Sequence, residues 1–146
     1  MTSTVAPVKA ALAALFTAAL PGVQVIYGPI DTQTTTDPNV LTVGDVLGAA
    51  ERDSLSYATA SEAYTVACSI SCGINGPDAQ QTVTELAMSF YIAAELAVRE
   101  HPTGDLGVAG VLGAQPTGEF ELVETAEPTG RYALVQFSVY VQAQRT

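Results

Sequence analysis

The residue types that usually carry catalysis are few in this sequence and stand far apart. His101 is the only histidine and Lys9 is the only lysine. His101 follows a predicted helix, where a partly cationic side chain interacts favourably with the helix dipole, and no nucleophile neighbours it in sequence. The serine-nucleophile motif G-x-S-x-G and the zinc motif H-E-x-x-H are both absent. We therefore expect no catalytic residues, and no enzyme.

The two cysteines, Cys68 and Cys72, belong to a segment that alternates like a strand. In an extended strand their separation is about 13 Å, whereas a disulfide needs Cα atoms within about 7 Å. Their spacing also lacks the C-x-x-C pattern and the companion ligands of a zinc site. We expect both thiols to be reduced and buried as small hydrophobic side chains.

Two other patterns resemble ligand sites but are explained better by structure. Residues 73–78, GINGPD, lead from a strand toward a helix, but no G-K-[ST] of a phosphate loop follows. Glu119, Glu121, Glu124 and Glu127 cluster on one predicted hairpin, which is typical of a solvated face rather than of a metal site. The sequence predicts no cofactor and no metal.

The charge composition is unusual for a chain of 146 residues with 48% hydrophobic residues. Only 14% of the residues are charged, against about 25% in ordinary soluble domains. Five basic residues face fifteen acidic ones, giving a net charge of −10. This balance predicts a poor nucleic-acid binder, and the sequence has no basic segment that would hold it on an anionic membrane. Low total charge favours a subunit whose surface is largely covered by neighbours.

The first part of the chain predicts one helix and one strand before a long loop. Residues 5–19 carry a helical apolar stripe that Pro21-Gly22 ends. A signal peptide is the alternative for this run, but a basic segment before it is missing. Residues 23–28 are β-branched and predict a strand, and 41–46 suggest another. The remainder of 29–61 is polar and small, so we expect a long exposed loop there. Segments 31–39 and 48–61 would either dock on a partner or form a surface loop without one.

Residues 62–74 predict a strand with two different faces. The core face would hold Tyr64, Val66, Cys68, Ile70, Cys72 and Ile74, and the other face carries only small uncharged side chains. The helix that follows is predicted to start at Asp78, as an N-cap with Gln81 completing a capping box, and to run to about Glu100. Its inward stripe would be Val83, Leu86, Ala87, Phe90, Ala94, Ala97 and Val98.

The C-terminal third predicts a short strand at Val108–Ala114 and a hairpin made of 119–127 and 131–145. The order of elements predicts a single α+β domain over residues 1–146, in which two helices pack on one face of a mainly antiparallel sheet.

The outward positions of the last strand carry no charge, although such positions in a soluble protein usually meet water. The 78–100 helix is likewise apolar over more than half of its circumference. We interpret both features as candidate surfaces for contact with another subunit or a partner. The candidate interface residues are Tyr132, Leu134, Gln136, Ser138, Tyr140, Gln142, Met88, Tyr91 and Ile92.

Four stretches together resemble the tail terminator proteins of long-tailed bacteriophages (siphoviruses), also called tail completion or minor tail proteins. They are VKAALAALFTAALPGVQVIYG, EAYTVACSISCGINGPD, AAELAVREHPTGDLG and GEFELVETAEPTGRYALVQFSVYVQAQR. The resemblance is one of order and pattern over most of the chain except residues 29–61, and no single motif is diagnostic.

The resemblance implies a structural, non-enzymatic virion protein located at the head–tail interface and assembled in the host cytoplasm. Such proteins look like a sheet flanked by helices and form a hexameric ring. The ring caps the tail tube, ends its polymerisation and joins the tail to head-closure or connector proteins. DNA passes through the ring without specific binding. No catalytic or cofactor residue is carried over from this family.

Two alternatives stay open on the sequence alone. One is another neck or tail-tube protein, because these share small α+β folds and ring assembly. The other is a small ligand-binding or hydrolytic α+β domain that would use the 29–61 loop.

Overall fold

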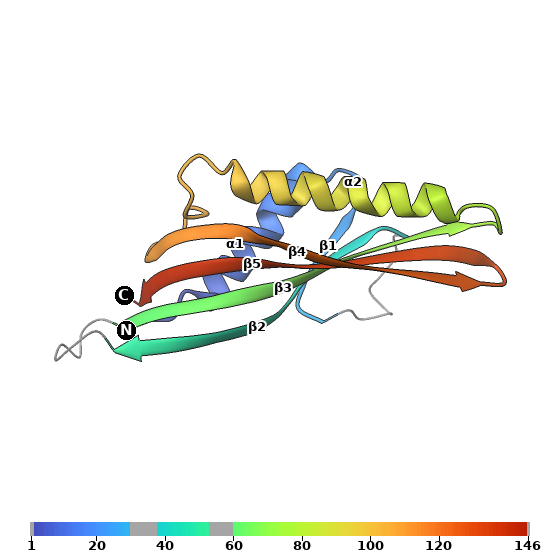
Figure 1. Ribbon diagram of the computed structural model, residues 1–146. Coiled ribbons are helices and arrows are strands. Elements are labelled where there is room, and N and C mark those ends of the chain that lie inside the picture. Colours follow the sequence, from blue (N-terminus) through green and yellow to red (C-terminus); the bar gives the residue numbers. More distant parts are fainter. Residues whose placement is uncertain (1, 30–37, 53–59, 146) are drawn as a thin grey trace.

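The fold is a five-stranded sheet with two helices, seen in a computed structural model that describes residues 2–29, 38–52 and 60–145 (Figure 1). The elements follow in the order α1 (Val5–Ala19), β1 (Gln24–Tyr27), β2 (Val40–Arg52), β3 (Ala60–Asn75), α2 (Gln80–Arg99), β4 (Val111–Glu127) and β5 (Gly130–Arg145). Among the described residues, neither helix has the length and apolarity needed to span a bilayer.

The strands lie in the order β1-β2-β3-β5-β4. Only β1 and β2 run parallel, and every other neighbouring pair is antiparallel. The long central strands β3 and β5 pair along their whole lengths, from Ala60 opposite Arg145 to Asn75 opposite Gly130. The predicted single α+β domain with a mainly antiparallel sheet is confirmed, and so is the predicted hairpin.

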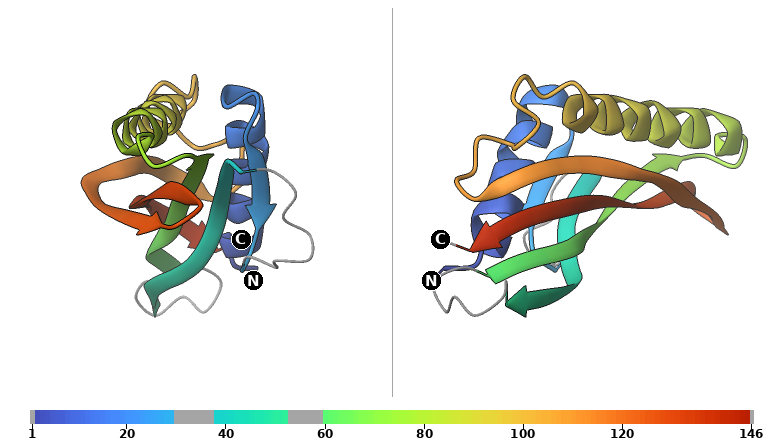
Figure 2. Two further views of the ribbon diagram at one scale, coloured as in Figure 1. Left: turned by 90° about the vertical axis from the view of Figure 1, so that its right-hand side faces the viewer. Right: turned by 60° about the vertical axis from the view of Figure 1, so that its left-hand side comes forward.

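Both helices pack on the same face of this sheet, α1 toward β1 and β2 and α2 over β3, β5 and β4 (Figure 2). Phe137 of β5 marks the centre of the core, because the rings of Phe16 from α1 and Tyr91 from α2 both meet its ring, at centroid distances of 6.2 and 5.3 Å. The apolar stripe predicted for α1 is confirmed by the complete burial of Val8 and Leu12 together with Phe16. Burial of these stripes against one sheet face is the main force that stabilises the helices.

The alternation predicted for the two central strands is also confirmed. Every second residue of β5 from Ala133 to Ala143 is buried, while the residues between them are partly or fully exposed. On β3 the same alternation runs from Ala60 to Cys72. These strands therefore have an inner face, which the helices cover, and an outer face, which they do not.

The expected strand at 41–46 is part of β2, but the loop expected to follow it is wrong over 47–52, because β2 extends to Arg52, which pairs with Ala60 at the start of β3. The alternation of β2 is hidden in the sequence by a β-bulge between Val43 and Val46, which shifts the register by one residue. Gly48 also looked like a loop residue, but a Cβ there would lie 2.3 Å from the Cβ of Tyr64, so the close approach of the two strands requires glycine. Of the two segments expected to dock on a partner, 31–37 and 53–59 lie outside the described residues.

Two smaller predictions are wrong as well. The short strand expected at Val108–Ala114 is the start of β4, which continues through a bulge between Pro116 and Phe120 to Glu127. Asp78 is not the N-cap of α2: the helix begins at Gln80, its N-cap is Ala79, and no side chain caps it. The turn before the helix sets the start of α2 without a capping box.

Candidate subunit interface

The outer sheet face is formed by the outward residues of the two central strands. On β3 they are Ser61, Ala63, Thr65, Ala67, Ser69, Ser71 and Gly73; on β5 they are Tyr132, Leu134, Gln136, Ser138, Tyr140 and Gln142. The β5 set is the group of six interface candidates that the sequence analysis identified. All of these positions are partly or fully exposed, and none carries a charge.

The charged residues of β3 and β5 all lie at inner-face positions instead. They are Glu62 on β3 and Arg131 and Arg145 on β5. Charged side chains are normally placed toward water, so this distribution is the reverse of the usual one. The arrangement leaves the outer positions of the two central strands free of ions that would have to lose hydration when another surface covers them.

A hollow of about 720 Å³ lies across the outer sheet face, and we call it the central hollow. Its floor is polar but uncharged, with Thr42, Thr65, Ser69, Gln136 and Ser138 among its lining residues. Hydrogen bonding continues across the strands, since the hydroxyls of Thr42 and Ser69 are paired.

Three carboxylates, from Asp45, Glu119 and Glu121, also line the hollow. Asp45 lies in the bulge of β2 and Glu119 in that of β4, whereas Glu121 follows the β4 bulge and pairs with Gln136. We call these three residues the acidic rim. The predicted solvation of the hairpin acids is confirmed, because Glu119, Glu121, Glu124 and Glu127 are all exposed.

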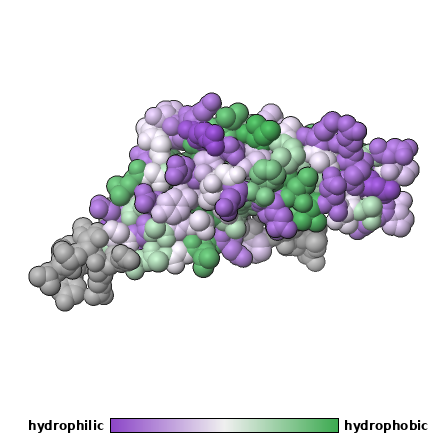
Figure 3. Space-filling model, in the orientation of Figure 1, coloured by the Kyte–Doolittle hydropathy of each residue, from purple (hydrophilic) through white to green (hydrophobic). Residues whose placement is uncertain are grey.

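On the opposite side of the molecule, α2 exposes an apolar surface that Figure 3 shows as hydrophobic side chains gathered over the middle of this helix. Ile92 is 53% exposed and Leu96 is 42% exposed. Arg99 lies one turn further on with a side chain that is 58% exposed and forms an ion pair of 2.8 Å with Glu95. We call Ile92, Leu96 and Arg99 the α2 stripe. Met88, a further interface candidate, is partly buried and packs against the core.

Tyr91, the remaining candidate, lies in the core and not on the surface, because it is only 4% exposed. Its ring stacks beside Phe120 and Phe137, and its hydroxyl donates a hydrogen bond of 2.6 Å to Glu95. Burial, together with the hydrogen bond to Glu95, raises the pKa of Tyr91 to about 12. The sequence analysis assigned Tyr91 to the exposed face of α2, but Tyr91 belongs to the inner face. The buried residues of this helix are Val83, Ala87, Tyr91, Ala94 and Val98.

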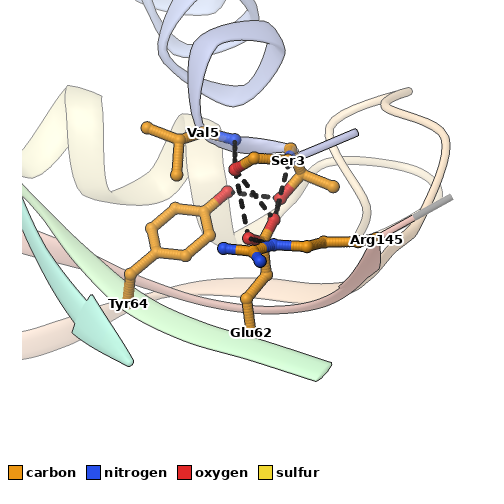
Figure 4. Close-up of polar contacts among 6 residues, drawn as sticks. Ser3, Val5, Glu62, Tyr64 and Arg145 are labelled. Carbon is orange, nitrogen blue, oxygen red and sulfur yellow. Dashed lines mark hydrogen bonds and ion pairs between the residues drawn. The ribbon is translucent and has the colours of Figure 1, made fainter. Parts of the chain in front are cut away.

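A buried ion cluster fixes the start of α1 to the ends of the central strands (Figure 4). The carboxylate of Glu62, only 5% exposed, accepts hydrogen bonds from the backbone N–H of Thr4 at 2.6 Å and from its hydroxyl at 2.5 Å. It also accepts one from Ser3 and one of 2.9 Å from Nε of Arg145. The hydroxyl of Tyr64 lies 2.8 Å from that of Thr4 and completes the group.

Burial alone would raise the pKa of Glu62, but the hydrogen bonds from Thr4, Arg145 and Ser3 outweigh it, so the pKa lies below its usual value. Sequence reasoning missed this cluster because its members are far apart in the chain. The one signal was a charged residue at an inner-face position of a strand.

The residues first considered for chemistry do not meet in space. Lys9 lies over the ring of Tyr27, with Nζ 4.5 Å from the centroid, and Nδ1 of His101 is paired with Thr103. Cys68 and Cys72 are free and buried, as expected. In the part of the chain that the structure describes, no three histidine, cysteine or acidic residues are grouped to hold a metal ion.

The sequence matches no protein-family model and no curated protein. Its fold is nevertheless found among solved structures, and one similar chain comes from "Virion of native gene transfer agent (GTA) particle". The two chains align over 97% of this one and 100% of the other, with a TM-score of 0.56 and 16% sequence identity. At this identity the likeness establishes a shared fold.

Proposed function

We propose that this protein is a structural, non-enzymatic component of a virion, and specifically a tail terminator that forms a ring on the end of a tail tube. The observation that carries the proposal is the outer sheet face, where the central strands carry no charge although neither helix covers them. The fold it shares with a chain of a virion particle gives independent support.

The physical argument concerns hydration. Covering a charged side chain costs far more free energy than covering a hydroxyl, an amide or an aliphatic group that finds partners. A face of serine, threonine, glutamine and tyrosine can therefore pack against another protein and exchange its water for protein hydrogen bonds. A surface meant only for solvent gains nothing from this avoidance of charge.

In this role the protein would assemble with copies of itself, as a hexamer in the family it resembles. The ring would contact the tail tube protein on one side and a head-closure or connector protein on the other. The net charge of −10 suits a ring through which DNA passes without being held, because clustered basic residues are what retain phosphate.

The first experiment measures assembly. The parent protein should form an oligomer by sedimentation and a ring in electron micrographs. Gln136→Lys and Tyr140→Lys should each yield folded protein that dissociates, because each places a hydrated charge into the contact. Thr129→Lys, in the exposed turn of the hairpin, is the matched control and should assemble normally.

The second experiment distinguishes a terminator from another neck or tube protein. Added to polymerising tail tube protein, a terminator should bind tube ends and shorten the tubes. Rings that leave tube length unchanged would refute the terminator role while keeping a structural one. A stable monomer that joins no particle would refute both.

A further inference from the structure

The α2 stripe and the outer sheet face lie on opposite sides of the molecule, since α2 covers the inner face of the sheet (Figure 1). Two copies that join through such opposite surfaces make a heterologous contact, in which one surface of the first copy binds the other surface of the second. Each copy still has one of its two surfaces free to bind a further copy. Repetition of such a contact gives a closed ring or a filament. A contact of the outer sheet face with itself would give only a dimer.

The α2 stripe presents a small apolar area and one cation. The surface that binds it should therefore have uncharged side chains and a negative charge. Ile92 and Leu96 are neighbours on the helix surface, and their side chains are about half exposed. Arg99 continues the same line toward the end of the helix and adds a guanidinium group. Exposed apolar groups beside an arginine are typical of contacts between proteins.

The central hollow offers the complementary chemistry. Its floor is small and uncharged, with Ala67, Ser69 and Ser138 among the lining residues, and its acidic rim carries three carboxylates. No lysine, arginine or histidine lines it. The hollow therefore attracts a cation at its rim and accepts uncharged side chains over its floor.

Arg99 is the basic side chain best placed to reach such a rim. Of the basic side chains that the structure describes, Lys9 lies over Tyr27, Arg131 binds backbone carbonyls, and Arg145 binds Glu62. Arg99 makes a single ion pair with a neighbour on its own helix. A guanidinium has five N–H donors, so it retains the capacity to bind a second carboxylate.

We propose that these two surfaces are the two halves of one contact between copies of this chain, in which the α2 stripe of one copy packs on the outer sheet face of the next and Arg99 meets its acidic rim. This inference rests on the proposed function and specifies how the ring would be built. Every copy in the ring then uses its α2 stripe to bind one neighbour and its outer sheet face to bind the other. The same contact repeats around the ring, and no second kind of contact is needed.

The test uses two variants that each lose one half of the contact. Ile92→Glu removes the α2 half and Gln136→Lys removes the sheet half, so each variant alone should be monomeric. An equimolar mixture should form one-to-one dimers and nothing larger, because only the intact sheet face of the first variant and the intact α2 stripe of the second can join. Ala14→Glu, at an exposed position of α1, is the matched control and should assemble like the parent.

A charge exchange tests the role of Arg99 itself. Arg99→Glu and Glu121→Lys should each weaken association by about tenfold, and the double variant should recover most of that loss. Recovery in the double variant but not in Arg99→Glu combined with the control Glu127→Lys would locate the partner of Arg99 at the rim.

The outcomes separate this inference from the proposed function. If Ile92→Glu assembles like the parent while Gln136→Lys does not, another occupant covers the outer sheet face; the pairing is then wrong and a structural role stands. If both single charge variants associate normally, or the double variant fails to recover, Arg99 does not meet the rim. If the parent is monomeric and joins no particle, both the proposed function and this inference are wrong.

Discussion

The two faces of the central strands differ in what fixes their side chains. The inner face of β3 and β5 is packed against both helices, and its charges lie near the strand ends, where Glu62 binds Thr4 and Arg145. The outer face of the same strands has small and polar side chains, no charge and a hollow in place of a packed layer. The backbone is common to both faces, so the difference belongs to the side chains alone.

The inner face therefore holds the residues that stabilise the fold, and the outer face holds those that are available for assembly. Substitutions on the inner face should lower the free energy of unfolding, because they remove packing or leave a buried polar group without its partner. Substitutions on the outer face should leave that free energy nearly unchanged and act on association. Four predictions test this contrast between the two faces, and the one with the greatest expected effect comes first.

The largest effect is expected at the centre of the core. Phe137→Ala should lower the free energy of unfolding by about 3–5 kcal/mol, because its ring contacts Phe16 and Tyr91 and leaves a cavity between the helices. Gln136→Ala, the next residue on the outer face, should change it by less than about 0.5 kcal/mol. Urea denaturation of both variants measures the contrast, and equal losses would show that the outer face is packed as well.

A smaller effect is expected at the ion cluster. Glu62→Gln should cost about 1–3 kcal/mol, because the NH2 group that replaces one carboxylate oxygen cannot accept the hydrogen bonds made there, either from Thr4 or from Ser3 and Arg145. Glu121→Gln is the exposed control and should have little effect on unfolding.

The cluster also predicts a pH dependence that belongs to Glu62. Because its pKa is lowered from 4.5 on folding, the unfolded chain takes up a proton first as the pH falls. The stabilisation should be complete above pH 4.5 and decline below it, toward the pKa of the folded state. Denaturation between pH 3 and 6 should show this decline in the parent and a flatter curve in Glu62→Gln; parallel curves would mean that the carboxylate is not specifically stabilised.

The smallest effect is expected at the cysteines, which are buried and should therefore take no part in assembly. Burial raises the pKa of the Cys68 thiol to about 12, so alkylation of the native protein at neutral pH should be slow and unfolding should accelerate it. Mass spectrometry of non-reduced protein should find both thiols free. Serine at both positions should reduce stability without changing oligomer size, and a mass that lacks a pair of hydrogens would reveal a disulfide and a wrong strand register.

The fold was predictable from sequence where the periodicity is uninterrupted. The core faces of β3 and β5 follow from strict alternation, and α1 follows from its apolar stripe and the Pro21-Gly22 stop. Prediction failed at β2 and at the start of β4, where bulges interrupt the regular pairing and glycines imitate a loop. A bulge is decided by the pairing with the neighbouring strand, which the local sequence does not contain.

The candidate interface was predictable only in part for a similar reason. The uncharged outer positions of β5 are visible in sequence because they alternate with a clear core. Tyr91 was misplaced because aromatic residues on both sides of α2 left its rotation undecided, and the positions of Phe120 and Phe137 settle it. The acidic rim and the Glu62 cluster each join residues from separate strands, so only the folded chain brings them together.

The Glu62 cluster has a mechanical consequence. The start of α1 and the end of β5 meet on one carboxylate, and Figure 1 shows both ends of the chain at the same end of the sheet. Tension on Arg145 would load β5 from its C-terminal end, where Arg145 pairs with Ala60 of β3. The first link to bear that load is the Arg145–Glu62 ion pair, and α1 holds its other side through Thr4. One carboxylate thus joins the start of α1 to the ends of both central strands, so a load applied at either end of the chain is shared among the three.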